Sequence, residues 1–114
     1  MKIVDTYKVE IYCGSRVGYT NEYISLDYLK QVCREYCDDT SYCVSITETH
    51  FVYKGGEEPG LHITMINYPR FPLSQETIND HGITLARILM DKARQKRVSV
   101  ICGRMTVMLE SDDE

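Results

Sequence analysis

The order of amphipathic patterns in this chain predicts an α+β domain, with two helices covering one face of an antiparallel sheet. Short segments that alternate apolar and polar residues flank two longer segments of helical periodicity. They follow in the order βαββαβ, and a further alternating segment closes the chain. Two right-handed crossovers around a central hairpin give a ferredoxin-like sheet. We expect the spatial strand order fourth, first, third, second, with an extra C-terminal hairpin strand outside the fourth.

The first predicted strand and the first predicted helix have regular patterns. The strand covers residues 6–13, and its apolar face comprises Tyr7, Val9, Ile11 and Cys13. Ser25 occupies the position of a helix N-cap, where a hydroxyl accepts a hydrogen bond from a free backbone amide. The apolar stripe that follows at helical spacing comprises Leu26, Leu29, Val32, Cys33 and Tyr36.

A long hairpin is predicted between Cys43 and Tyr68, with its turn across residues 54–60. Its second strand points Leu61, Ile63 and Met65 toward the helices. Its first strand, residues 43–53, has an ambiguous phase, because Val44 and Ile46 share a parity with Glu48 and His50. Three interpretations remain open. The two ionisable groups face the helices, a bulge near residues 47–49 switches the face, or the distal half extends past the helices and is solvated on both faces.

The second helix is predicted to follow the prolines at 69 and 72, which end the strand before them. Ser74 is its N-cap. Its apolar stripe comprises Ile78, Gly82, Leu85, Leu89 and Ala93. A glycine inside a helix costs about 1 kcal/mol relative to alanine. Gly82 therefore indicates either close packing of the helix on the sheet or a slight kink.

Residues 98–109 are predicted to form a tight hairpin about Gly103-Arg104. A two-residue loop with glycine first is typical of a type II′ turn. The resulting register opposes apolar pairs along one face, namely Cys102 with Met105, Val100 with Val107 and Val98 with Leu109. A single long strand kinked at Gly103 is the alternative.

Length and charge bound the function. The 114 residues form one domain, 1–114, whose acidic tail, 111–114, is expected to be disordered. A net charge of −4 argues against nucleic-acid binding, which depends on clustered Lys and Arg. The apolar runs are too short to cross a membrane. Five cysteines without a CxxC pair, and a start without the apolar run of a signal peptide, indicate free thiols in a reducing cytoplasm.

The face of the sheet that the helices leave open is predicted to be apolar. Its residues are Tyr12, Ile66, Tyr68, Ile101 and Met108, joined by Phe51 and Tyr53 if the ambiguous strand keeps a simple phase. Apolar patches of several hundred Å² usually mark an interface. We therefore expect a homodimer that buries this face; a monomer with scattered tyrosines is the alternative. RNA recognition by the same face is disfavoured by the net charge and by the missing aromatic signature.

The loop Gly14–Gly18 is the first candidate for a ligand site. Backbone amides of this loop, which includes Gly14, Ser15 and Arg16, could hold an anion together with the Arg16 side chain, and Arg70 is assigned to the same site. The loop is neither a P-loop nor a GxGxxG motif. An ordinary connection between strand and helix is the alternative.

Two further groups of residues are weaker candidates, one for a metal site and one for a catalytic site. Cys33, Cys37 and Cys43, with His50 or His62, could surround zinc, but cytosolic zinc sites usually show CxxC pairs, so no metal and no cofactor is expected. Glu48 and His50 share one strand face and could form an acid–base pair. No nucleophile with an orienting partner accompanies them, so no catalytic residue is assigned.

Several segments resemble small uncharacterised proteins of tailed phages and their bacterial hosts. The shared features are VEIYCGSR, then GYT before the first helix, NYPRFP after the long hairpin, and the closing VSVICGRMTVML. The resemblance implies the ferredoxin-like fold and the cytoplasm of a bacterial or phage-infected cell. It also implies a phage or mobile-element accessory protein, many of which counter host defences, and it transfers no catalytic residue.

These features favour a small non-enzymatic interaction protein over an enzyme. It would bind a host protein, possible roles including that of an anti-defence inhibitor. The alternative is a protein that binds or sequesters a small ligand or nucleotide through the Gly14–Gly18 loop.

Overall fold

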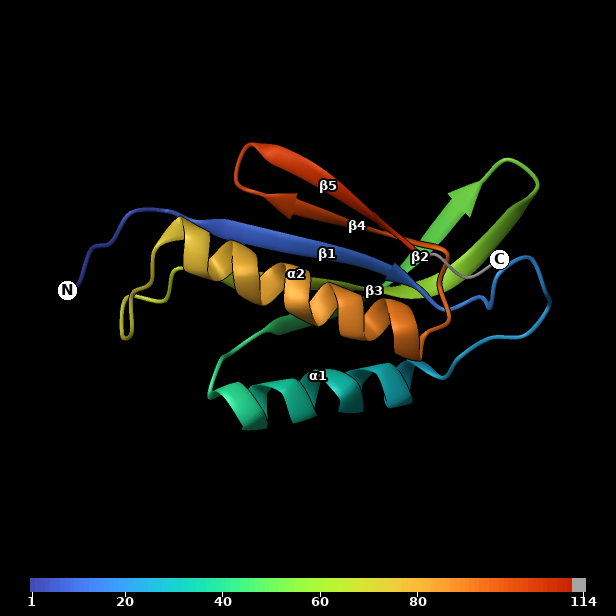
Figure 1. Ribbon diagram of the computed structural model, residues 1–114, viewed down its shortest axis with the longest axis horizontal. Coiled ribbons are helices and arrows are strands. Elements are labelled where there is room, and N and C mark those ends of the chain that lie inside the picture. The colour runs from blue at the N-terminus through green and yellow to red at the C-terminus, as the bar shows by residue number, and fades with distance from the viewer. Residues whose placement is uncertain (112–114) are drawn as a thin grey trace.

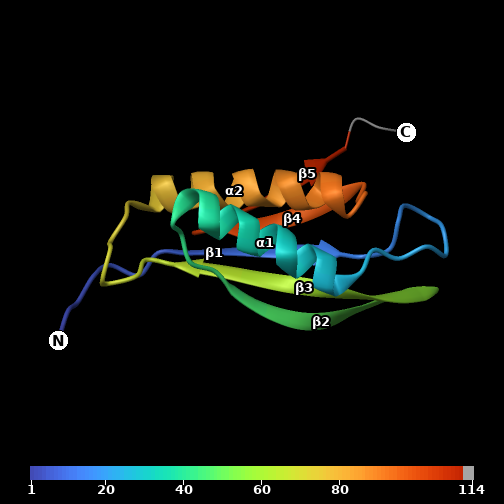
Figure 2. The same cartoon turned by 90° about the horizontal axis from the view of Figure 1, so that it is seen from below.

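The computed structural model describes residues 1–111 and has the predicted α+β architecture (Figure 1). Its elements in chain order are β1 (Lys8–Gly14), α1 (Leu26–Thr40), β2 (Ser45–Tyr53), β3 (Gly56–Ile66), α2 (Gln75–Lys92), β4 (Arg97–Cys102) and β5 (Met105–Glu110). The strands form one antiparallel sheet in the order β2-β3-β1-β4-β5. Both helices lie side by side on one face of it (Figure 2). The strand order expected from the crossovers is confirmed.

Both helices begin at the predicted caps. The Ser25 hydroxyl accepts a hydrogen bond from the amide of Tyr28, and the Ser74 hydroxyl accepts one from the amide of Thr77. Such caps satisfy amides that have no partner inside the helix. Helix α1 ends at Ser41, whose backbone is left-handed, with φ of 60°. These local signals fix where the helices start and therefore which stripe faces the sheet.

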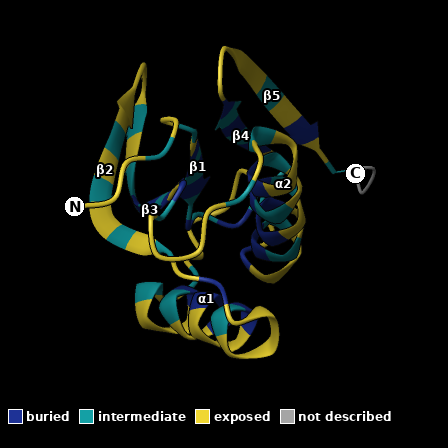
Figure 3. Ribbon diagram, turned by 90° about the vertical axis from the view of Figure 1, so that its left-hand side faces the viewer, coloured by how far each residue is buried: buried dark blue, intermediate teal, exposed yellow. Residues whose placement is uncertain are grey.

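The core lies between the helices and the sheet (Figure 3). Its fully buried large side chains include Val9, Ile11, Leu29, Leu61, Ile63, Met65, Ile78, Leu85 and Leu89. Helix α2 crosses β1 closely at Gly82, where an added Cβ would overlap the Cγ1 of Val9. Of the two explanations for this helical glycine, the structure supports close packing on the sheet.

The turn of the β2–β3 hairpin is shorter than the sequence predicted. It consists of Lys54 and Gly55 alone, with Gly55 at a φ of +83°, and β3 already begins at Gly56. The prediction of a turn across residues 54–60 is therefore wrong. Pro59 is tolerated inside β3 because β1 ends opposite Gly60, so the missing N–H removes no bond to β1.

The phase of β2 is settled by its pairing. The register with β3 runs unbroken from Ser45 opposite Thr64 to Tyr53 opposite Gly56, without a bulge in this range. Ile46 is half-buried, whereas Val52, of the same parity, is 74% exposed. The distal half of the hairpin projects beyond the helices (Figure 1). Solvation of the distal half is therefore seen on the helix side, whereas Thr49 and Phe51 on the other face are half-buried, so the interpretation of an end solvated on both faces holds only in part.

The C-terminal segment is a hairpin with the predicted register, including Cys102 opposite Met105 and Val98 opposite Leu109. In its turn Gly103 has a φ of +61°, as the first position of a type II′ turn requires. Met105 is 67% exposed, because β5 is the edge strand and the helices cover it only in part.

The acidic tail lies at the limit of the described residues. The amide of Ser111 donates to the carbonyl of Lys96, and residues 112–114 lie outside the described residues, as does most of the predicted disordered segment.

Within residues 1–111, neither helix is both long and apolar enough to cross a membrane.

Candidate binding site on the open sheet face

The open face of the sheet carries a continuous row of side chains across all five strands. The row is Thr47, His62, Tyr12, Ser99 and Met108, each directly opposite the next in the register. Ile101 lies opposite Glu10, and Ile66 lies opposite Lys8. The hairpins β2–β3 and β4–β5 splay apart on either side of β1 (Figure 3). Tyr12, Ile66, Ile101 and Met108 therefore lie on the face to which the sequence assigned them.

Tyr68 does not lie on this face. It follows the end of β3, and its ring packs edge-on against Tyr42, at a centroid distance of 6.2 Å, and against Phe71 at 5.7 Å. Burial, together with a hydrogen bond to Cys43, raises the pKa of the Tyr68 hydroxyl above its ordinary value. Strand β3, and with it the alternation of its side chains between the two faces, ends at Ile66. The prediction that Tyr68 lies on the open face extended this alternation too far and is wrong.

An aromatic pair and a carboxylate occupy the centre of the open face. The rings of Tyr12 and His62 stack at a centroid distance of 4.7 Å and an angle of 22°. His62 Nε2 lies 2.9 Å from Glu10 Oε1, and Lys8 Nζ lies 3.7 Å from the same oxygen. The Glu10 side chain is only 16% exposed. No partner of His62 was predicted from the sequence. The β1–β3 register, which places His62 opposite Tyr12, was the signal that could have identified one.

Glu58 holds the loop between β1 and α1. Its Oε2 accepts hydrogen bonds from the backbone amides of Ser15, at 3.0 Å, and Arg16, at 2.8 Å. Its Oε1 accepts one from the Tyr53 hydroxyl at 3.3 Å, and that hydroxyl accepts one from Arg16 Nη1 at 3.4 Å. The sequence predicted that this loop binds an anionic ligand. In the structure, a carboxylate of the protein itself takes up two of these amides.

Two glycines permit this arrangement. A Cβ at Gly14 would lie within 2.5 Å of Glu58 Oε2, and a Cβ at Gly60 would overlap the Phe51 ring. The loop is also tied from the other side, since Gln95 Nε2 donates to the carbonyl of Arg16 at 2.6 Å. Glycine at both positions lets side chains from β2, β3 and the loop converge above the strands.

Arg70 lies far from this cluster. Because β1 and β3 are antiparallel, with Lys8 opposite Ile66 and Gly14 opposite Gly60, the chain leaves β3 at the opposite end of β1 from Arg16. Six residues of strand separate these ends by about 20 Å. Figure 1 shows the two loops at opposite ends of the molecule. The structure does not bring Arg16 and Arg70 together.

Glu48 and His50 each have a separate surface partner. Glu48 lies 3.4 Å from Lys30 Nζ, and His50 Nε2 lies 3.5 Å from Glu57. More than half of each side chain is exposed, at 60% for Glu48 and 53% for His50. Exposed pairs of this kind contribute little to stability, and this one offers no enclosed acid–base site.

Three of the five cysteines, Cys13, Cys33 and Cys102, are buried, whereas Cys37 is half-buried and Cys43 is exposed. Burial raises the pKa of the Cys13 and Cys33 thiols to about 12. Within residues 1–111, no group of three or more His, Cys, Asp and Glu side chains is arranged to hold a metal ion. His81 Nδ1 lies 2.6 Å from the Tyr36 hydroxyl, and its ring stacks on Tyr42 at 4.3 Å. These contacts join α1, α2 and the chain leading into β2.

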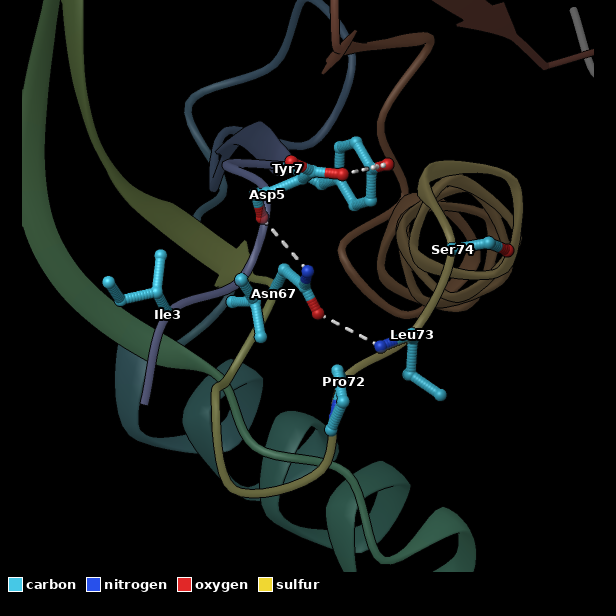
Figure 4. Close-up of a pocket in the computed structure, with 8 residues that line it drawn as sticks. Ile3, Asp5, Tyr7, Asn67, Pro72, Leu73 and Ser74 are labelled. Atoms are coloured by element: carbon cyan, nitrogen blue, oxygen red, sulfur yellow. Dashed lines mark hydrogen bonds between the residues drawn. The ribbon is translucent and has the colours of Figure 1, made fainter. Parts of the chain in front are cut away.

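A pocket of about 450 Å³ lies at the other end of the molecule (Figure 4). It is lined by Ile3, Val4, Asp5, Tyr7, Asn67, Pro72, Leu73 and Ser74. The Asn67 side chain donates to the carbonyl of Asp5 and accepts from the amide of Leu73, both at 2.9 Å. The Ser74 hydroxyl caps α2. The volume suits a small ligand. The polar groups of Asn67 and Ser74, however, are used in hydrogen bonds that hold the surrounding segments together. The open face of the sheet is therefore the better candidate for a binding site.

Comparison with known proteins bears on the fold. No protein-family model and no curated protein matches the chain. A solved structure of a phage SAM lyase in the apo state matches with a TM-score of 0.77 and 14% sequence identity, covering 95% of this chain and 91% of that one. This chain shares its fold with a phage enzyme. A phage SAM lyase in complex with S-methyl-5′-thioadenosine matches with a TM-score of 0.75 and 17% identity, covering 96% and 92%.

These matches correct the functional expectation drawn from the sequence. A motif-free acidic domain favoured a non-enzymatic protein that binds a host protein, with an anti-defence inhibitor as one form. That prediction is wrong, because the proteins that share the fold from end to end are described as lyases. The expected likeness to phage proteins holds in the coarse sense that both structures are of phage proteins. At these identities the likeness establishes the fold.

Proposed function

We propose that this protein is an enzyme that binds S-adenosylmethionine (SAM) and cleaves it to S-methyl-5′-thioadenosine. The observation that carries this proposal is the match to phage SAM lyase over 95% of this chain and 91% of the other. One of the matched structures contains S-methyl-5′-thioadenosine, which is SAM without its four-carbon amino acid chain.

The charge of the protein suits this ligand. SAM carries a sulfonium and an ammonium against one carboxylate, so it is a cation, and the chain has a net charge of −4. SAM also has no phosphate. Glu58 takes up the Ser15 and Arg16 amides, so the surroundings of this loop suit a nucleoside cation better than an anionic nucleotide. The small-ligand alternative is kept in this modified form.

The proposed reaction needs no general acid or general base from the protein. A carboxylate oxygen of SAM can attack its own Cγ, the electron pair of the carbon–sulfur bond passes to sulfur, and a lactone is released. No proton moves and no water adds. The protein has to hold the amino acid chain of SAM in a bent conformation, with the carboxylate oxygen in line with the bond from Cγ to sulfur. It also has to exclude water, because the opposite charges of the carboxylate and the sulfonium disappear as the reaction proceeds. A site without an identifiable nucleophile or base fits this route.

The open face offers the groups that such binding needs. The stacked rings of Tyr12 and His62 offer an aromatic surface against which the adenine base can stack. Glu58 has both oxygens engaged, by two amides and a hydroxyl, so it suits a role in fixing charge better than one in accepting a proton. These residues lie on one face of β1, β2 and β3, close enough in register to meet one ligand.

Water exclusion calls for a cover over this face, and we assign that role to a second copy of the chain. Ile66 and Met108 on the same face are 40% and 52% exposed in the single chain. A homodimer sealed there would complete the site. Light scattering on Ile66→Asp tests this: wild type as a dimer and the variant as a monomer support it, and a monomeric wild type at micromolar concentration contradicts it.

The resemblance to small proteins of tailed phages and their hosts supports the bacterial cytoplasm, where SAM is made, as the proposed setting of the reaction. The direct test is incubation of the purified protein with SAM and mass spectrometry of the products. We expect S-methyl-5′-thioadenosine together with a four-carbon lactone. Tyr12→Ala should lose turnover, whereas Tyr28→Ala, an exposed tyrosine on α1, should retain it. Product formation no faster than in buffer alone would overturn the proposal.

A further inference from the structure

We propose that Phe51, Tyr53 and Glu58 form a cation subsite that holds the sulfonium centre of the substrate and releases the uncharged thioether product. The inference rests on the proposed function and concerns one part of the same face. It assigns a task to the solvated end of the β2–β3 hairpin, which the fold does not need for its core.

The two aromatic rings lie against backbone that has no side chain. Phe51 covers Gly60 and Tyr53 covers Gly56, each so closely that a Cβ on the glycine would overlap the ring. Both rings thus lie at the surface of the strand, and neither Phe51 nor Tyr53 is fully buried. Tyr53 is 42% exposed. A small cation can approach such rings along the ring normal, the direction in which a π system attracts it.

Glu58 brings a negative charge between the rings. It lies directly opposite Phe51 in the register, and its Oε1 receives the Tyr53 hydroxyl at 3.3 Å. Oε2 already accepts two amides, whereas Oε1 accepts this one long bond and retains acceptor capacity. Two π faces beside a carboxylate reproduce the composition of sites that recognise methylated ammonium ions. A methylated sulfonium is a cation of the same weakly hydrated kind.

The neighbouring cation, Arg16, is held mainly by other groups. Arg16 donates through Nε to the carbonyl of Thr20 and reaches Tyr53 only at its hydroxyl, at 3.4 Å. The guanidinium is therefore tied to the loop and to the edge of one ring. It orients Tyr53 and lies close enough to Glu58 for the two charges to attract.

The spacing joins this subsite to the aromatic pair at the centre of the face. Gly60, beneath Phe51, lies two residues from His62 along β3, or about 7 Å. One ligand can place its base on Tyr12 and His62 and its sulfur over Phe51. Cleavage converts the sulfonium into a neutral thioether, which removes the attraction to the rings and to Glu58. The subsite thus favours substrate over product and limits inhibition by the product.

The test compares two ligands that the enzyme cannot cleave in this way. Sinefungin carries a protonated amine at the sulfur position, whereas S-adenosylhomocysteine carries a neutral thioether. Calorimetric titration gives the ratio of their dissociation constants. We expect wild type to prefer sinefungin, and Phe51→Leu and Glu58→Gln each to reduce the preference by about three- to tenfold, the usual size of one cation–π or exposed charge contact. Phe71→Leu, at the exposed aromatic on the opposite loop, is the matched control.

The outcomes separate the two proposals. A reduced preference in the Phe51 and Glu58 variants, with an unchanged preference in the Phe71 control, supports the subsite. Binding of both analogues with the same ratio in all proteins overturns the subsite and leaves the proposed function standing. Failure of wild type to bind either analogue or S-methyl-5′-thioadenosine overturns the proposed function, and the subsite with it.

Discussion

Glu58 is predicted to stabilise the loop between β1 and α1 through three hydrogen bonds, and its removal should have a defined size. The carboxylate accepts from the amides of Ser15 and Arg16 and from the hydroxyl of Tyr53. Bonds to a charged acceptor contribute about 1.5–3 kcal/mol each where they are buried, and less where water can replace the acceptor. These bonds are part-buried or exposed, so Glu58→Ala should destabilise the protein by about 2–4 kcal/mol. Glu58→Gln keeps one oxygen for the amides and should lose about half of that.

Thermal unfolding followed by circular dichroism measures this difference. For a domain of this size 1 kcal/mol corresponds to about 4 °C in Tm, so we expect a decrease of about 8–16 °C for Glu58→Ala and about half of that for Glu58→Gln. Hydrogen exchange should accelerate at the Ser15 and Arg16 amides in both variants. Glu57→Ala is the matched control, because this neighbouring carboxylate is 67% exposed and pairs only with His50 at the surface.

The reasoning is refuted if Glu58→Ala and Glu57→Ala unfold at the same temperature. It is also refuted if the loop amides of the Glu58 variants exchange no faster than those of wild type. Either result would mean that the carboxylate does not bind the amides in solution, and the loop would again be free to hold an anion.

Two further predictions concern the core. Gly82→Ala should lower the free energy of unfolding by about 1 kcal/mol, because overlap with Val9 outweighs the gain in helix propensity. In a Val9→Ala background the same change should be stabilising. A decrease in both backgrounds would contradict the packing explanation. The pKa of the buried Cys13 and Cys33 thiols is raised from 9 to about 12, so the folded state disfavours their ionisation. Their contribution to stability is complete below about pH 9 and is lost as the pH rises toward 12. Denaturant midpoints should therefore fall over this range, and fall less in Cys13→Ala; an equal decline in that variant would contradict the assignment.

Local patterns predicted most of the fold. Hydroxyls at Ser25 and Ser74 marked the helix starts, and Gly82 reported a close crossing that the structure contains. The register of the last hairpin followed from apolar residues that had to share a face. These features were accessible because each depends on residues near one another in sequence or on the handedness of crossovers.

The candidate site was less accessible, because its contacts join distant parts of the chain. Glu58 lies 43 residues from Ser15 along the chain, and a single sequence shows no sign of that pair. Pro59 was assigned to a turn because proline is rare within strands, and only the end of β1 opposite Gly60 explains why it fits. A reaction that needs neither nucleophile nor base also leaves no motif to detect.

The central claim is tested most directly by incubating the purified protein with SAM in water enriched in heavy oxygen and analysing the products by mass. The account predicts S-methyl-5′-thioadenosine, formed in proportion to protein concentration, and a four-carbon lactone that carries no heavy oxygen when first released. Recovery of intact SAM would contradict the proposed function. Release of homoserine with heavy oxygen on its side-chain hydroxyl would contradict the intramolecular route, since it would show that water attacked the carbon.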